Sequence, residues 1–232
     1  MVRVLILRPR AEAEETALAA VARGHEPSIL PLHEIVPHDA APPGRDVSGF
    51  VATSAHALPA LAAAFGGDDR PLLAVGSRTA RLAADLGFPR VVEGDGSGES
   101  LLAPASRVFS ADGRPLLYAA GRVRTPALEE ALYSGAVAVL VWEVYDTRPL
   151  DLMPQTVLHA LLEPAPEAVM LLSVGQAEAY GQLLARMPPG TAPEPRLLCL
   201  SARIAAALPA ALSGRIEISD EASMAALFDL LR

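Results

Sequence analysis

The sequence predicts an α/β fold of two similar domains, in which parallel sheets are flanked by helices. Three observations support this prediction. Short apolar runs of strand length alternate with Ala/Leu-rich segments of helical length from end to end. The pattern of one half recurs in the other, and proline-rich stretches punctuate the chain at residues 37–44, 149–154 and 188–195. Alternating strands and helices are typical of βαβ units, which build parallel sheets.

The individual elements are predicted from hydrophobic runs and from the residues that end them. Gly24, Gly87 and Gly135 follow helical segments, where glycine favours the end of a helix. The predicted strands are residues 2–7, 28–32, 49–53, 72–75, 90–92, 115–119, 136–144, 168–172, 197–200 and 216–218. The predicted helices are residues 11–23, the segment after 53 to about 65, and residues 80–86, 100–106, 127–133, 153–161, 175–185, 202–212 and 223–230.

An internal repeat organises these elements in the order A, B, A′, B′. The matching segments are 4–32 with 116–144, 49–65 with 168–184, and 72–80 with 197–205. Two pairings are open: A with B and A′ with B′, or the continuous block B–A′ as one domain and A with B′ as the other. The first two proline-rich stretches bracket a block of about a hundred residues, the size of a small domain, and favour the second pairing. Residues 33–37 and 143–148 are then two crossings between the domains, side by side.

Composition excludes several classes of function. The chain has 19 basic residues, all of them arginine, against 27 acidic residues, for a net charge of −8. Without lysine there is no P-loop lysine, Schiff-base lysine or lysine general base. The acidic balance argues against nucleic acid or an anionic membrane surface as a partner. Cys199 is the one cysteine, so neither an internal disulfide nor a thiolate metal cluster is expected, and a cytoplasmic protein without membrane spans is predicted.

Candidate binding residues follow the predicted strands, because ligands of open parallel sheets bind outside the carboxyl ends of the strands. The turns there carry small, hydroxylic or arginine residues and open helices, whose free N–H groups and dipole favour anions. The candidates are Arg8, Ser54, Ala55, Gly76, Thr79, Gly121, Arg124, Ser173, Val174 and Gly175. Any one of the hydroxyls can be a simple helix cap. Their recurrence on two domains predicts a site for an anionic ligand.

Other motifs indicate less chemistry. The five histidines form no helical i, i+4 pair with an acidic helper, so no metal site is predicted. Residues 94–98 are glycine-rich but have no lysine and no phosphate-loop spacing, and they are interpreted as a flexible loop. Tyr145 lies at the proposed crossing between domains. Its hydroxyl can donate a proton into a cleft, or the side chain can simply pack between domains, and both interpretations are open.

Several segments, taken in order along the chain, resemble the uroporphyrinogen-III synthase family. They are residues 4–10, 24–27, 30–32, 53–57, 74–80, 119–129 and 144–147. The resemblance implies two α/β domains joined by a two-stranded linker, with the active site in the cleft between them, and it supports the B–A′ pairing. The expected domains are residues 1–34 with 150–232, and residues 38–143. Residues 33–37 and 144–149 are the expected linker strands.

The resemblance also implies an activity. The family converts the linear tetrapyrrole hydroxymethylbilane into uroporphyrinogen III in haem biosynthesis, as a lyase that inverts the last pyrrole ring and releases water. The resemblance further implies that the protein is a monomer and needs no cofactor or metal. Tyr145 matches a tyrosine thought to help loss of the terminal hydroxyl, and Thr79 matches a threonine at the site.

The second half of the chain departs from the family pattern. Gly175 stands where the family usually has a second hydroxylic residue, and residues 201–204 replace a Gly-Pro-x-Thr-like turn. A hypothesis from another class is therefore a non-catalytic, synthase-like protein that binds an anionic small molecule. The changed turn favours this binder, whereas the presence of Tyr145 and Thr79 favours the enzyme.

Overall fold

A computed structural model describes residues 1–96, 98–188 and 190–232, without the side chains of residues 110–112. Ser97 of the predicted flexible loop and Pro189 of the third proline-rich stretch lie outside the described residues. The chain divides into two compact units. Unit 1 comprises Met1–Glu34 and Arg148–Arg232, and unit 2 comprises Ile35–Thr147.

Unit 1 is built on a five-stranded, fully parallel sheet in the order β11-β10-β9-β1-β2. Its strands are β1 (Arg3–Ile6), β2 (Glu26–Ile29), β9 (Ala168–Leu171), β10 (Arg196–Cys199) and β11 (Ile216–Ile218). Its helices are α1 (Arg10–Val21), α6 (Pro154–Leu162), α7 (Val174–Ala185), α8 (Ala202–Ala205), α9 (Met224–Asp229) and the 3₁₀ helix η3 (Ala210–Arg215).

Unit 2 is built on a six-stranded sheet in the order β3-β8-β7-β4-β5-β6, parallel from β8 to β6. Its strands are β3 (His33–Pro37), β4 (Gly49–Ala52), β5 (Leu72–Ala74), β6 (Val91–Glu93), β7 (Leu116–Gly121) and β8 (Val139–Pro149). Its helices are α2 (Leu58–Phe65), α3 (Ser77–Asp85), α4 (Leu102–Asp112), α5 (Ala127–Ser134) and the 3₁₀ helices η1 (Ala55–Ala57) and η2 (Glu99–Leu101).

The two sheets share one strand order, β2-β1-β9-β10-β11 in unit 1 and β8-β7-β4-β5-β6 in unit 2. The equivalent strands come in a different chain order: β1 and β2 precede their three partners, whereas β7 and β8 follow theirs. The units are therefore circular permutations of each other, with β3 added to unit 2. The predicted α/β architecture of mainly parallel sheets flanked by helices is confirmed.

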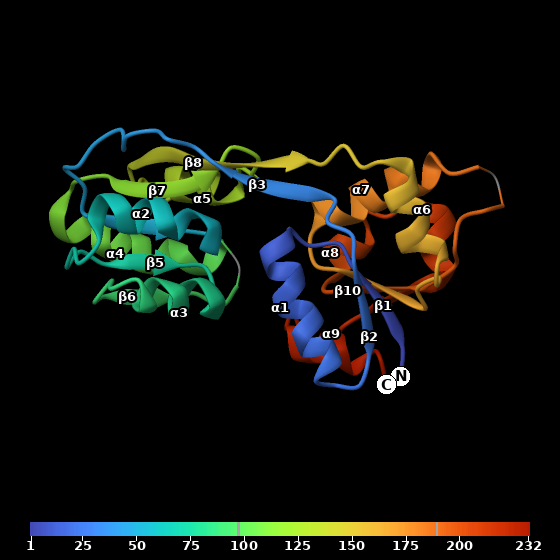
Figure 1. The fold of residues 1–232 in the computed structure, drawn as a ribbon. Helices are drawn as coiled ribbons and strands as arrows, with labels where there is room; N and C mark the ends of the chain where they lie inside the picture. Colours follow the sequence, from blue (N-terminus) through green and yellow to red (C-terminus); the bar gives the residue numbers. More distant parts are fainter. Residues whose placement is uncertain (97, 189) are drawn as a thin grey trace. The chain divides into compact units, whose positions relative to one another are not determined.

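Helices cover both faces of each sheet, which explains why most strands are continuous apolar runs. In unit 2, α2 and α3 pack on the face that includes Phe50, and α4 and α5 pack on the face that includes Tyr118. In unit 1, α6 and α7 cover one face, and α1 and α9 cover the other (Figure 1).

The chain passes between the units within β3 and β8, which are hydrogen-bonded neighbours (Figure 1). His38 N donates to Val144 O (2.8 Å), and Leu150 N donates to Leu32 O (2.9 Å). Because the earlier residue of one strand pairs with the later residue of the other, these two strands are antiparallel.

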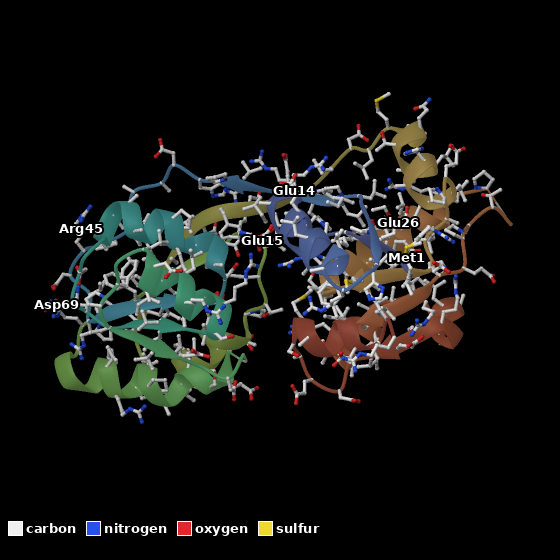
Figure 2. All side chains as sticks on the ribbon, turned by 60° about the horizontal axis from the view of Figure 1, so that its bottom comes forward. Met1, Glu14, Glu15, Glu26, Arg45 and Asp69 are labelled. Atoms are coloured by element: carbon white, nitrogen blue, oxygen red, sulfur yellow. The ribbon has the colours of Figure 1, made fainter. Side chains whose placement is uncertain are left out.

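Arg70 fastens the amino-terminal edge of the unit 2 sheet. Its guanidinium donates to both carboxylate oxygens of Asp68 (2.9 and 2.6 Å) and to the carbonyl oxygens of Arg45 and Val47 (2.9 and 2.8 Å). It also stacks over the Phe50 ring, 4.9 Å from the centroid. Figure 2 shows the loops of Arg45 and Asp69 together at this edge. These contacts lie at the amino-terminal edge of the sheet, whereas the candidate site lies at the opposite, carboxyl-terminal edge.

Several predicted boundaries are wrong, and backbone chemistry explains the largest differences. The predicted helix 202–212 is two short pieces, because Pro209, which has no N–H, stands between α8 and η3. The predicted strand 136–144 begins only at Val139, since Ala136 has a positive φ of 55°. The helix predicted at 80–86 already starts at Ser77, and the helix predicted at 100–106 continues to Asp112.

Within the described residues, none of the helices combines the length and the apolar character that a membrane crossing needs.

Tyr180 and Tyr118 offer a matched test of the two cores. Tyr180 OH is buried without a hydrogen-bond partner among the described residues, and burial raises the pKa of this phenol to about 12. Tyr118 OH shares a 2.9 Å hydrogen bond with Thr53 Oγ1. Tyr180→Phe should raise the free energy of unfolding by about 1 kcal/mol, and Tyr118→Phe should lower it by a similar amount. Urea denaturation of both variants measures this. A loss of stability in Tyr180→Phe contradicts an orphan hydroxyl.

Candidate functional site

The predicted site residues lie at the carboxyl-terminal edge of each sheet, next to the point where strand order reverses. In unit 2 the reversal lies between β4, followed by Ser54, and β7, which ends at Gly121. In unit 1 it lies between β1, followed by Arg8, and β9, followed by Ser173. Such switch points are where open α/β sheets bind ligands. Each unit therefore presents its own candidates at the carboxyl-terminal edge of its sheet, beside the switch point.

A β-bulge in β8 decides where Tyr145 points. Ala120 of β7 pairs with Glu143, and the next residue, Gly121, pairs with Tyr145, so Val144 is skipped in the pairing with β7. Before the bulge, alternate residues of β8 face opposite sides, and Val144 faces the α2 and α3 side. Strict alternation would send Tyr145 to the other side, but the extra residue returns it to the side of Val144.

The Tyr145 ring lies directly on Gly121. A Cβ atom at Gly121 would come within 2.7 to 2.9 Å of Cζ, Cε2 and the hydroxyl oxygen of Tyr145. The His56 ring meets the Tyr145 ring edge to face, with centroids 5.5 Å apart. Tyr145 is 9% exposed, and its hydroxyl has no hydrogen bond to any described residue. Gly121 thus makes room for a buried phenol that is available as a proton donor.

Ser54 and Ala55 place His56 beside this ring. Ser54 caps η1, its Oγ accepting a hydrogen bond from His56 N (3.3 Å), and Ala55 is the first residue of η1. The preceding residue, Thr53, turns to the opposite face of the sheet and bonds Tyr118. The Ser54 hydroxyl therefore acts first as a cap in this structure.

The first turn of α3 is a second polar feature of the same edge. Its N-cap is Gly76, and no side chain caps the helix, so the first N–H groups lack a partner within the helix. Thr79 lies in this turn and is 6% exposed, and its hydroxyl bonds no described residue. The segment after β6 runs close by, since Gly96 N donates to Val75 O (2.7 Å). These donors suit a carboxylate.

Arg124 is bound to protein carboxylates. Its guanidinium donates to Glu129 (2.6 Å) and Glu143 (2.9 Å), and also to Gly121 O (3.0 Å). The hydrogen bond from Arg124 holds the pKa of Glu143 below its usual value, and the bond to Glu129 raises the pKa of Arg124. Two carboxylates therefore flank this guanidinium, and Glu143 also accepts from Arg122 Nε (3.4 Å).

In unit 1, Arg8 is also engaged within the protein. Its Nη1 donates to Thr16 Oγ1 (3.0 Å), which in turn donates to Glu12 O in the first turn of α1 (2.8 Å). The Arg8 side chain therefore lies along the first turns of α1.

The remaining unit 1 candidates form the start of α7. Ser173 Oγ accepts from Gln176 N (3.2 Å), and Gln176 Oε1 accepts from Leu172 N (2.9 Å), a reciprocal arrangement similar to a capping box. Val174 and Gly175 follow as the first helical residues. A Cβ atom at Gly175 would meet nothing within 4 Å. The Ser173 oxygen is thus committed to the cap, while space is open beside Gly175.

In the described part of the chain, no three His, Cys, Asp or Glu side chains gather in a way that could hold a metal ion. The arrangement instead combines a buried phenol with backbone N–H groups and a threonine hydroxyl. It is suited to donating a proton and binding anionic groups.

The sequence interpretation missed the packing around Tyr145. His56 had no assigned role, and the need for glycine at 121 was not apparent. The sequence carried no distinct signal of the bulge, because residues 139–142 of the same strand are also a run of adjacent apolar residues.

Comparisons with known proteins identify the family and the fold. The family model described as "Uroporphyrinogen-III synthase HemD" matches residues 14–229. The solved uroporphyrinogen-III synthetase of Helicobacter pylori is similar with a TM-score of 0.66 and 14% identity, covering 100% of this chain and 98% of that one. A mutant uroporphyrinogen III synthase of the extremely thermophilic bacterium Thermus thermophilus is similar with a TM-score of 0.55 and 20% identity, covering 100% and 97%. A comparison with curated protein sequences finds no significant match.

Gly121 and Gly175 allow a matched test of the site geometry. Gly121→Ala should displace the Tyr145 ring and lower the free energy of unfolding by about 1–3 kcal/mol, because the new methyl group overlaps the ring. Gly175→Ala should leave stability unchanged or raise it by up to about 1 kcal/mol, because the space there is open. Urea denaturation measures both effects. Equal stability of the two variants would mean that the ring does not lie on Gly121.

Proposed function

Because the chain belongs to the uroporphyrinogen-III synthase family, which acts in haem biosynthesis, we propose that it catalyses the family's reaction as a lyase. The substrate is the linear tetrapyrrole hydroxymethylbilane, and the products are uroporphyrinogen III, with ring D inverted, and water. We further propose that the protein works as a cytoplasmic monomer.

The observation that carries this proposal is the setting of Tyr145. Its hydroxyl is nearly buried, has no hydrogen bond to a described residue, and lies on the carboxyl-terminal edge of a sheet beside a switch point. A phenol so placed can donate a proton to a leaving hydroxyl, and exclusion of water strengthens that interaction.

The proposed reaction needs one proton donor and strict positioning. As the terminal carbon–oxygen bond breaks, the hydroxyl leaves as water with the proton of Tyr145, and the pyrrole nitrogen lone pair stabilises the resulting azafulvenium cation. Attack by the substituted carbon of ring D gives a spiro intermediate, which fragments and recloses. The ring carbon that forms the last bond loses a proton, which restores the phenol. The overall change is loss of water, so no oxidant or reductant is consumed.

The carboxylate arms of the substrate need donors that the protein does not already use. We assign this role to the first turn of α3, with Gly76 and the Thr79 hydroxyl, and also to the first turn of α7, at Val174 and Gly175. Ser173 caps α7 and Ser54 caps η1 at the same edge as α3, and in both bonds the serine oxygen accepts, so the hydroxyl hydrogen can still be donated.

The charge balance of the protein agrees with this assignment. The net charge is −8, and Arg8 and Arg124 both donate to groups of the protein itself. Helix N-termini supply positive potential without changing the net charge. An acidic protein can in this way bind a substrate rich in carboxylates.

The decisive experiment supplies freshly made hydroxymethylbilane and separates the type I and type III products. Unassisted closure gives type I, so the proposal expects type III to form in proportion to enzyme. If only type I appears, at the uncatalysed rate, the protein is a non-catalytic binder or acts on another compound.

Tyr145→Phe tests the assigned proton donor. It should lower kcat by about 10- to 100-fold, at the low end of general acid catalysis, because water can partly replace the phenol. The product should remain type III, since ring positioning is a separate task. Tyr133→Phe is the control: Tyr133 is 86% exposed on α5, and turnover should not change. Unchanged turnover in Tyr145→Phe would remove Tyr145 from the mechanism.

A further inference from the structure

The guanidinium of Arg124 joins three elements at the Tyr145 bulge. It donates to Glu129 on α5, to Glu143 on β8, and to the carbonyl oxygens of Gly121 and Arg122 where β7 ends (3.0 and 3.3 Å). A planar, five-donor group can satisfy several acceptors in fixed directions at once. With 22% of its side chain exposed, Arg124 is largely enclosed by these partners.

The groups that Arg124 holds are those that set the position of Tyr145. Gly121 lies under the Tyr145 ring, and Glu143 lies two residues before Tyr145, on the other side of Val144, the residue that β7 skips. Arg122 adds a second tie, because its N donates to Tyr145 O (2.9 Å). A bulge interrupts the ladder of hydrogen bonds, so its geometry depends on such additional contacts.

The same contacts make Arg124 an unfavourable site for a substrate carboxylate. Nε and Nη1 make all of its hydrogen bonds to described residues, and two carboxylates flank the guanidinium, with the bond to Glu129 only 2.6 Å long. A carboxylate arm of the substrate could reach only Nη2 without displacing Glu129 or Glu143, and repulsion by these two carboxylates would offset most of its gain.

We propose that Arg124 is a positioning residue that holds the β7–β8 bulge, and with it Tyr145, in the orientation for proton donation, and that it does not bind a substrate carboxylate. This inference rests on the proposed function of Tyr145. It predicts that Arg124 acts on turnover only through Tyr145.

A double-mutant cycle with Arg124→Met and Tyr145→Phe separates the two roles. For a positioning residue, Arg124→Met should lower kcat by about the same factor as Tyr145→Phe and change KM by less than about twofold, and the double variant should be no slower than Tyr145→Phe alone. For a substrate-binding residue, KM should instead rise in both backgrounds, and the effects of the two substitutions should multiply. That second result would overturn the proposal.

Arg124→Lys sharpens the distinction. Lysine keeps the positive charge but cannot bond the four acceptors of the arginine fork. If Arg124 positions the bulge, Arg124→Lys should resemble Arg124→Met in kcat. Restoration of wild-type kcat and KM by lysine would contradict the proposal. Glu143→Gln should show the same pattern with a smaller loss, and it serves if Arg124→Met fails to fold.

A measurement without substrate keeps this inference separate from the proposed activity. The chain has four tyrosines, so ¹³C-labelled tyrosine gives four ring signals that Tyr→Phe variants assign. Arg124→Met should shift the Tyr145 signal and leave those of Tyr133 and Tyr180 in place. An unmoved Tyr145 signal overturns the inference, whereas absence of type III product from the wild-type protein overturns only the proposed function.

Arg196→Met is the matched control. Arg196 donates to Glu217 (2.6 and 2.7 Å) and to Leu230 O (2.5 Å), so it resembles Arg124 in its bonding, but it lies at the amino-terminal end of β10 in unit 1. Arg196→Met should lower the free energy of unfolding while kcat and the Tyr145 signal stay at their wild-type values.

Discussion

The register shift between β7 and β8 is the constraint on which the candidate site depends. One residue, Val144, is skipped in the pairing with β7, which turns Tyr145 to the side of the sheet where η1 and α3 begin. The ring can lie there only because Gly121 has no side chain. Arg124 then ties the strands together on both sides of the shift. The bulge interrupts the regular pairing of the strands and fixes the orientation of the Tyr145 phenol. The surrounding contacts offset the cost of this irregularity.

The permuted repeat explains why the two sheets have a similar architecture. The helix caps that follow equivalent strands nevertheless differ. The helix after β5 is α3, which has a glycine N-cap and no side-chain cap. Its equivalent after β10 is α8, which has four residues and is capped by Ser201. The same contrast applies to Thr79, whose hydroxyl has no bond to a described residue, and Ser173, whose oxygen caps α7. A shared strand order places the turns, and capping decides which donors remain for a ligand.

Much of the positive charge of the arginine side chains is used within the fold. Three arginines bond groups of the protein itself: Arg8 bonds Thr16 of α1, Arg70 bonds the amino-terminal edge of unit 2, and Arg124 bonds the strands at the bulge. Arg70 and Arg124 each bond several acceptors, which is the arrangement for which the guanidinium group is better suited than an ammonium group. The absence of lysine therefore agrees with a site in which side-chain cations organise the backbone and helix N-termini attract the anion.

The sequence by itself determined the alternation of strands and helices, the repeat, and the edge at which the candidates gather. It could do so because buried parallel strands are apolar runs, and because all parallel strands end at one edge. The start of the strand near Ala136 and the limit of the helix near Pro209 were less accessible, since they depend on local backbone conformation. Only the tertiary structure decided that Tyr145 faces α3, that Gly121 must be small, and that Arg124 pairs with Glu129 and Glu143. These features depend on one residue of register and on partners distant in sequence, which a period-2 pattern does not encode.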